Sequence, residues 1–240
     1  VAGFFLNLIE VNIPDANLRA TLENRLGKSS GDEIRDIELE TITHLKAGYS
    51  GDAGTEITDL EGIEYCVNLE MLDFNGQSSI SGSPAELARL EALPELISLG
   101  LGNTTQLTNL SALANLTGLQ RLYLGHNNGH GKLNDISAVQ SLTNLNTIHF
   151  FGNEVVDISA LQSLSLLSVH PNGGILPGHA IDVLSTLTDL RTLETSYLDW
   201  IDDDLPQLLA NLTNLERFEH HDNDSGSGSI TDLSAFFAYL

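Results

Sequence analysis

An apolar motif of fixed spacing recurs along most of this chain and constrains its fold more than any other feature. Its clearest copy is Leu119, Leu122, Leu124 and Asn127, which follows the pattern L-x-x-L-x-L-x-x-N. Weaker copies begin at Ile42 near the start and at Leu190 and Leu215 towards the end. From Leu69 to Leu215, the first apolar residues of the copies are Leu69, Leu96, Leu119, Leu145, Leu164, Leu190 and Leu215. Most of these intervals match the length of one coil of a leucine-rich repeat, roughly 20 to 29 residues.

The alternation within the motif predicts how each coil folds. The L-x-L part places two leucines on one face of a short strand, and the residues between them on the other face. One coil cannot enclose its own leucines, whereas stacked coils bury them in a continuous core behind a parallel sheet. We therefore predict an α/β leucine-rich-repeat solenoid, a right-handed arc with a parallel concave sheet. The motif asparagine is expected to be structural, because its amide can satisfy backbone groups where the chain turns.

Coil length predicts a convex side of mixed α and 3₁₀ segments. Ser83 followed by Pro84 is typical of a helix start, and this helix is expected to run to about residue 93. Similar helices are predicted for residues 178–187 and 204–212. The shorter coils around Ser111 and Ser137 leave room only for a 3₁₀ turn. The short interval from Leu145 to Leu164 suggests a local deletion that kinks the solenoid.

The two ends of the array need caps, because an open coil exposes leucines and a sheet edge. Asp15 as N-cap, leucines at helical spacing and Gly27 as the stop predict an amphipathic cap helix. We treat residues 1–240 as one domain. Its cap covers about residues 10–40, its repeats about 41–229, and residues 230–240 form a partial last repeat or a C-terminal cap.

Composition excludes several classes of partner. Ten basic and 33 acidic side chains give a formal net charge of -23, which repels nucleic acid and anionic lipid. The acidic residues either keep an extended protein soluble or attract a cationic partner. No apolar stretch reaches the length of a membrane span, and residues 1–9 lack the features of a signal peptide. The single cysteine, Cys66, is expected to be a buried hydrophobe.

No sequence pattern of a common enzyme class is present. The chain has no G-x-S-x-G, no G-x-x-x-x-G-K-[ST] and no H-E-x-x-H motif. It also lacks the D-x-[DN]-x-[DN]-G loop of a calcium site. We therefore expect a protein that is not an enzyme, with no cofactor and no metal site.

Two segments resemble a known group of proteins. The segment 11–18, VNIPDANL, with the helix that follows it, and the coil 107–119, LTNLSALANLTGL, look like bacterial internalin-type leucine-rich proteins. The similarity covers nearly the whole chain. It implies a secreted or cell-surface protein that binds other molecules through its concave sheet, although a cytoplasmic location stays open. The shared residues are structural, so the resemblance transfers no ligand.

The strand positions between the leucines predict where a partner would bind, because they face the concave side. Exposed tyrosine, phenylalanine and arginine dominate binding energy at protein interfaces. The alternative, without a binding role, is that aromatic residues are common on strand surfaces because they favour β-strands. A zinc site or a pH switch built on the histidines is a weaker alternative. The predicted partner-binding residues are Arg121, Tyr123, His126, His149, Phe151, His170, Tyr197, Arg217 and His221.

These patterns support two functional hypotheses. The first is a non-catalytic recognition module, secreted or on the cell surface, that binds a protein or glycan partner on the concave face as a monomer. The alternative is an intracellular or structural scaffold that assembles through its convex helices or through the C-terminal end around Phe236.

Overall fold

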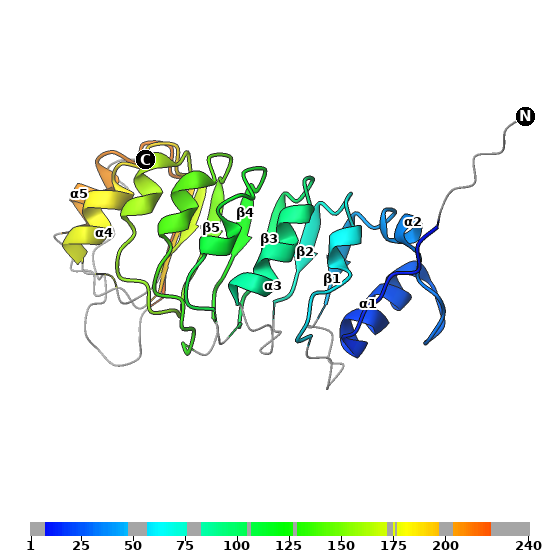
Figure 1. The fold of residues 1–240 in the computed structure, drawn as a ribbon. Helices are drawn as coiled ribbons and strands as arrows, with labels where there is room; N and C mark the ends of the chain where they lie inside the picture. Colours follow the sequence, from blue (N-terminus) through cyan, green and yellow to red (C-terminus); the bar gives the residue numbers. More distant parts are fainter. Residues whose placement is uncertain are drawn as a thin grey trace, which may run out of the picture.

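The described part of the chain forms one open sheet of eight parallel strands that lie side by side in chain order (Figure 1). This computed structural model describes residues 8–47, 57–75, 83–104, 107–126, 129–171, 175, 177–196 and 204–221. The strands are β1 (His44–Lys46), β2 (Met71–Asp73), β3 (Ser98–Gly100), β4 (Arg121–Tyr123), β5 (Thr147–His149), β6 (Ser168–His170), β7 (Thr192–Ser196) and β8 (Arg217–His221). The predicted solenoid of coils with a parallel sheet is confirmed, whereas the prediction for residues 230–240 lies outside the described residues.

Short helical segments cover the other face of the sheet (Figure 1). They are α2 (Asp36–Leu39), η1 (Ile63–Tyr65), α3 (Pro84–Ala88), η2 (Arg89–Ala92), η3 (Ser111–Leu113), η4 (Ser137–Ser141), η5 (Ser159–Ser163), α4 (Pro177–Leu184) and α5 (Asp204–Leu209), where η marks a 3₁₀ helix. The mixture of α and 3₁₀ segments is as predicted. The Ser83 hydroxyl accepts a hydrogen bond from the Glu86 backbone N–H, which caps α3. The predicted helices 178–187 and 204–212 end earlier, at Leu184 and Leu209.

The middle residue of each three-residue strand, β1 to β6, points into the core, and so does Leu193, the second residue of β7. Leu122 pairs laterally with Leu99 on one side and Ile148 on the other, and all three are fully buried. Their neighbours Arg121 and Tyr123 are only half-buried and lie on the opposite face. This confirms the predicted register: leucines inward, intervening residues outward.

The predicted register fails in one coil. Val169 pairs with Ile148, so the motif of this coil begins at Leu166, which is fully buried, and not at Leu164. Leu167, expected inside, is 38% exposed. The segment carries leucines in two phases, and a match by spacing alone selected the wrong one. The interval from Leu145 is therefore longer than predicted, and part of the expected deletion came from this shift of phase.

Amide side chains connect successive coils. The Asn153 amide donates to the backbone oxygens of Leu124 (2.8 Å) and Phe150 (3.0 Å), which confirms a structural role for this motif asparagine. A second set precedes the first leucine of a coil: Asn144 Nδ2 donates to the Thr117 oxygen at 2.8 Å, and Asn214 Nδ2 donates to the Thr188 oxygen at 2.9 Å. The bonds to Leu124, Thr117 and Thr188 each tie a coil to the one before it, whereas the bond to Phe150 stays within its own coil.

The N-terminal cap is the predicted helix, α1 (Ala16–Leu26), at the β1 end of the array (Figure 1). Asp15 caps it by accepting from the backbone N–H groups of Asn17 and Leu18, and Gly27 ends it in a left-handed conformation with φ 69°. The second Asp15 oxygen accepts from the backbone N–H and the hydroxyl of Thr58, at 2.8 and 2.9 Å. One carboxylate therefore fixes both the helix start and its attachment to the first coil. No helix in the described part of the chain is long and apolar enough to cross a membrane.

Two substitutions of Asp15 should separate its role as helix N-cap from its contact with Thr58. Partial burial raises the pKa of Asp15, but hydrogen bonds from Thr58, Leu18 and Asn17 outweigh it and hold the pKa below its usual 3.8. Asp15→Ala removes both roles and should lower the free energy of unfolding by about 2 to 3 kcal/mol at pH 7. Asp15→Asn keeps the cap, weakens the Thr58 contact and should cost about 1 kcal/mol. Urea denaturation measures both.

The lowered pKa of Asp15 determines how the difference in free energy of unfolding depends on pH. A carboxylate with a lowered pKa stabilises the fold above its usual pKa, and that stabilisation is lost as the pH falls through the lower, folded value. The difference in free energy of unfolding between the wild-type chain and Asp15→Asn should therefore become smaller as the pH falls. A gap that widens in acid would contradict this assignment.

Candidate functional site

The outward strand side chains form two rows across the sheet, on the surface that we call the concave face. The central row follows the lateral register and contains Lys46, Asp73, Gly100, Tyr123, His149, His170, Glu194 and Glu219. The parallel row contains His44, Met71, Ser98, Arg121, Thr147, Ser168, Thr192 and Arg217. Residues that lie one coil apart in the sequence therefore become direct neighbours.

Four rings form a continuous aromatic surface in the middle of the concave face, in which His170 is only 7% exposed and supports the other rings. The Tyr123 and His149 ring centroids lie 5.2 Å apart, edge to face. His149 meets His170 in the same way at 5.6 Å, and Phe151 stacks on His170 at 4.3 Å with an interplanar angle of 24°. Such pairs each stabilise by about 0.5 to 1.5 kcal/mol beyond their burial, so the rings hold one another in place.

An ionic cluster continues the central row beyond the rings. Glu194 lies between His170, whose Nδ1 is 3.3 Å from one carboxylate oxygen, and Arg217, whose Nη1 is 3.1 Å from the other. Arg217 also contacts Glu219 at 2.8 Å. The hydrogen bond and the charge of Glu219 raise the pKa of the already basic Arg217. Arg217 is thus tied to two carboxylates and contributes less free positive charge than the sequence indicates.

Two of the predicted histidines are held neutral by burial. Burial lowers the pKa of His149, and the charge of Glu194 partly opposes this; the His149 Nε2 lies 3.3 Å from the Ser168 hydroxyl. Burial, together with the charge of His130, also lowers the pKa of His126.

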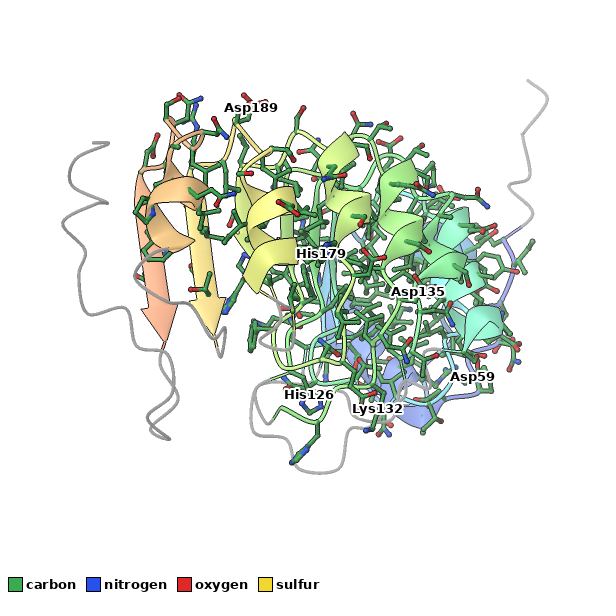
Figure 2. The ribbon with its side chains drawn as sticks, turned by 90° about the vertical axis from the view of Figure 1, so that its left-hand side faces the viewer. Asp59, His126, Lys132, Asp135, His179 and Asp189 are labelled. Carbon is green, nitrogen blue, oxygen red and sulfur yellow. The ribbon has the colours of Figure 1, made fainter. Side chains whose placement is uncertain are left out.

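His126 departs from the sequence expectation. It is only 4% exposed and lies at the edge of the solenoid, past the end of β4 and near Lys132 (Figure 2). Its Nδ1 accepts from the His130 N–H at 3.4 Å, and no partner for Nε2 is found in the described part of the chain. His126 cannot be displayed to a partner in this conformation.

The other predicted residues fall into three groups. Tyr123, His149, Phe151 and His170 come together, with Arg121 in the adjoining row on the strand of Tyr123. Arg217 belongs to the ionic cluster. Tyr197 lies outside the described residues, and the side chain of His221, at the end of β8, is also outside them.

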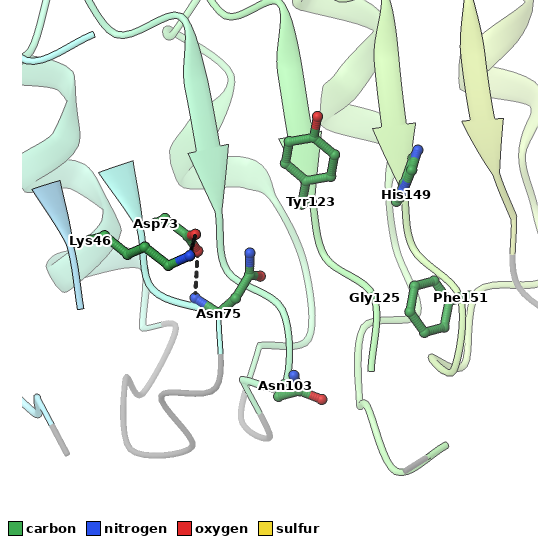
Figure 3. Close-up of a pocket in the computed structure, with 8 residues that line it drawn as sticks. All are labelled: Lys46, Asp73, Asn75, Asn103, Tyr123, Gly125, His149 and Phe151. Carbon is green, nitrogen blue, oxygen red and sulfur yellow. Dashed lines mark hydrogen bonds and ion pairs between the residues drawn. The ribbon is translucent and has the colours of Figure 1, made fainter. Parts of the chain in front are cut away.

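A hollow of about 320 Å³ opens on the concave face beside the aromatic surface (Figure 3). Its lining residues are Lys46, Asp73, Asn75, Asn103, Tyr123, Gly125, His149 and Phe151. Polar side chains from the β1 to β3 coils form one wall, and Tyr123, His149 and Phe151 form the other (Figure 3). The predicted binding set did not include the polar wall.

Two glycines make room for side chains that line this hollow. Gly100 stands in the central row where its neighbours carry side chains, and an added Cβ would come within 2.7 Å of the Asn75 amide nitrogen. A Cβ on Gly125 would overlap the Phe151 ring. A glycine inside a strand often marks a close approach of this kind, so Gly100 was the sequence signal that could have located the hollow.

A second hollow, of about 440 Å³, lies beside the 3₁₀ segments η4 and η5. Asp135, among the helical segments in Figure 2, and Asp157 line it. Each already accepts the backbone N–H two residues further on, from Ser137 and Ser159, which lowers both pKa values. These carboxylates therefore shape the turns. Within the described ranges, no group of three or more histidine, cysteine or acidic side chains could hold a metal ion.

Comparison with solved structures finds the same architecture in bacterial proteins. An internalin (InlF) from Listeria monocytogenes is 26% identical with a TM-score of 0.59, covering 93% of this chain and 79% of its own. Internalin C2 from the same species is 27% identical with a TM-score of 0.60, covering 92% of this chain and all of its own. A leucine-rich-repeat protein from Leptospira interrogans, 21% identical with a TM-score of 0.54, covers 87% of this chain and 47% of its own and supports the fold alone. No protein-family model and no curated protein sequence matches the chain.

The electrostatic coupling between His149 and Glu194 can be measured directly. Glu194→Gln removes the charge that raises the pKa of His149, so burial acts unopposed and the pKa should fall further below 6.5. NMR titration of the His149 ring protons measures the shift. Glu216→Gln, which removes an equal charge from the exposed Glu216–Arg191 pair, is the matched control and should leave the His149 pKa unchanged. A rise in the Glu194→Gln variant would contradict the assignment.

Proposed function

This chain is an internalin-like leucine-rich-repeat protein of the bacterial type, and we propose that it is a recognition module that holds a partner on its concave face. The partner is a protein or a glycan, and the module is secreted or displayed at the cell surface. The role is binding and not catalysis. The likeness to two Listeria internalins supports the placement of the module outside the cell.

The observation that carries this proposal is the aromatic surface formed by Tyr123, His149, Phe151 and His170. Tyrosine and phenylalanine are large and have few rotatable bonds, so a partner gains contact area at low entropic cost. Here the rings are already fixed by mutual stacking and edge contacts. The rings of Tyr123 and His149 lie on the face of the sheet opposite to the core residues Leu122 and Ile148, so the hydrophobic core does not account for them.

Charge separates this surface from the rest of the molecule. The chain carries a formal charge of -23, whereas the charged side chains of the central row lie in ion pairs. Lys46 lies 3.7 Å from Asp73, and Arg217 of the parallel row contacts both Glu194 and Glu219. A partner can therefore approach the rings without meeting a field of unpaired carboxylates. This arrangement favours recognition by shape and ring contacts over general attraction of cations.

The scaffold alternative has less support. Its C-terminal arm, with Phe236, lies outside the described residues. The large apolar side chains that are exposed in the described residues are Leu8, Ile9, Ile37, Val156 and Leu167. One of these five, Ile37, belongs to α2, and none belongs to the segments from η1 to α5, which would form most of a convex assembly surface.

Replacing Tyr123 and Phe151 with alanine should abolish partner binding. The immobilised full chain is screened against panels of extracellular proteins and polysaccharides, and each captured partner is measured again with the variants. Loss of two central aromatic anchors should weaken binding at least 100-fold, since each hot-spot side chain is worth about 2 kcal/mol or more.

The matched control is Val156→Ala, which truncates an exposed apolar side chain outside the strands. It should leave affinity unchanged. Circular dichroism checks that each variant is folded. If a partner binds the Tyr123→Ala, Phe151→Ala double variant as tightly as the original chain, the concave site is refuted.

A further inference from the structure

We propose that the hollow on the concave face is a subsite for a neutral pyranose ring of a glycan. This inference rests on the proposed recognition function and names the chemistry of its ligand. It is carried by one aromatic wall and one polar wall that face each other across the hollow, which Gly125 also lines (Figure 3).

The aromatic wall fits the apolar face of a sugar. A pyranose ring presents a patch of C–H groups, which packs against an aromatic ring much as other apolar groups do. Phe151 provides such a ring, held in place by its stacking on His170 at 4.3 Å. Tyr123 rises from β4 next to it, and its edge contact with His149 limits its rotation. The wall is thus formed before a ligand arrives.

The polar wall fits the hydroxyl groups of the same ring. Asp73 Oδ1 accepts from the Asn75 backbone N–H at 2.9 Å, and Asn75 Oδ1 accepts from the Gly102 N–H at 2.7 Å. These bonds fix a carboxylate and an amide at the edge of the hollow. Sugar hydroxyls both donate and accept, so they match a wall that offers amide N–H donors, carboxylate acceptors and an ammonium group.

The size of the hollow indicates one ring and not an extended chain. A volume of about 320 Å³ is at the low end of the roughly 300 to 1,000 Å³ typical of small-molecule sites. Gly125 lines it without a side chain, and the Asn75 amide fills the space beside Gly100 and Gly102. A longer glycan would have to continue along the concave face.

The charges favour a neutral ligand. Lys46 and Asp73 compensate each other across 3.7 Å, and burial lowers the pKa of His149 and favours its neutral form. An acidic sugar is repelled by the -23 charge of the whole chain. The same charge attracts an arginine or lysine side chain, but the carboxylate of Asp73 in the hollow is already compensated by Lys46. A neutral ring needs no charged partner.

Saturation-transfer difference NMR on the full chain tests the inference. The neutral probes are the methyl glycosides of glucose, galactose, mannose and N-acetylglucosamine. The charged probes are glucuronate and N-acetyl-arginine amide. At least one neutral glycoside should bind with roughly millimolar affinity, as expected for a single sugar ring, and more tightly than either charged probe.

Two variants locate the binding. Phe151→Leu keeps an apolar side chain but removes the aromatic face, and Asn75→Ala removes the amide; each should weaken glycoside binding at least 10-fold. Thr147→Ala changes the same face outside the hollow and should leave binding unchanged. Absence of glycoside binding, tighter binding of the arginine probe, or unchanged binding in Phe151→Leu would overturn the inference.

The outcomes separate this inference from the proposed function. If no glycoside binds but a macromolecular partner still loses affinity in the Tyr123→Ala, Phe151→Ala double variant, the recognition surface stands and the sugar subsite is refuted. If a partner is indifferent to that double variant, the proposed recognition surface is refuted.

Discussion

The structure depends on burial of motif leucines that no single coil can enclose by itself. Leu122 is fully buried only because Leu99 and Ile148 flank it in the neighbouring coils. Full burial of such a side chain is worth roughly 1.5 to 3 kcal/mol, so each added coil stabilises the one before it. The first coil has no predecessor, and the cap helix α1, attached through Asp15, takes that place.

The same stacking produces the candidate site. Because leucines fix the register, each outward residue lies beside its counterpart in the next coil, and Tyr123, His149 and His170 form one row although each comes from a different coil. The core thus fixes the backbone on which the surface is displayed. Recognition can vary through the outward positions without cost to the leucines, which suits a scaffold used for binding.

The fold could be predicted from sequence because it follows from one periodic constraint. The coils, the cap with Asp15 and Gly27, and the 3₁₀ turns at Ser111 and Ser137 were all expected and are found. Spacing failed only where Leu164, Leu166 and Leu167 supplied two possible phases, since burial of the stacked neighbours decides between them.

The site was predictable only in part. Periodicity shows which residues face outward, so Tyr123, His149 and Phe151 were identified. It does not show how deep a side chain lies after the strand ends, which is why His126 was expected on the surface and is buried. The ion pairs of Arg217 and the hollow beside Gly125 depend on contacts between coils, which sequence spacing does not encode.

Cysteine scanning along β4 tests whether the strand leucine faces the core and its two neighbours face the solvent. Cys66 is buried and its pKa is raised to about 12, so it gives little background labelling. Single cysteines at positions 121, 122 and 123 are reacted with a thiol reagent under native conditions. Arg121→Cys and Tyr123→Cys should be labelled fast, and Leu122→Cys should be strongly protected. Fast labelling at position 122 with protection at position 123 would contradict the burial of the motif leucines.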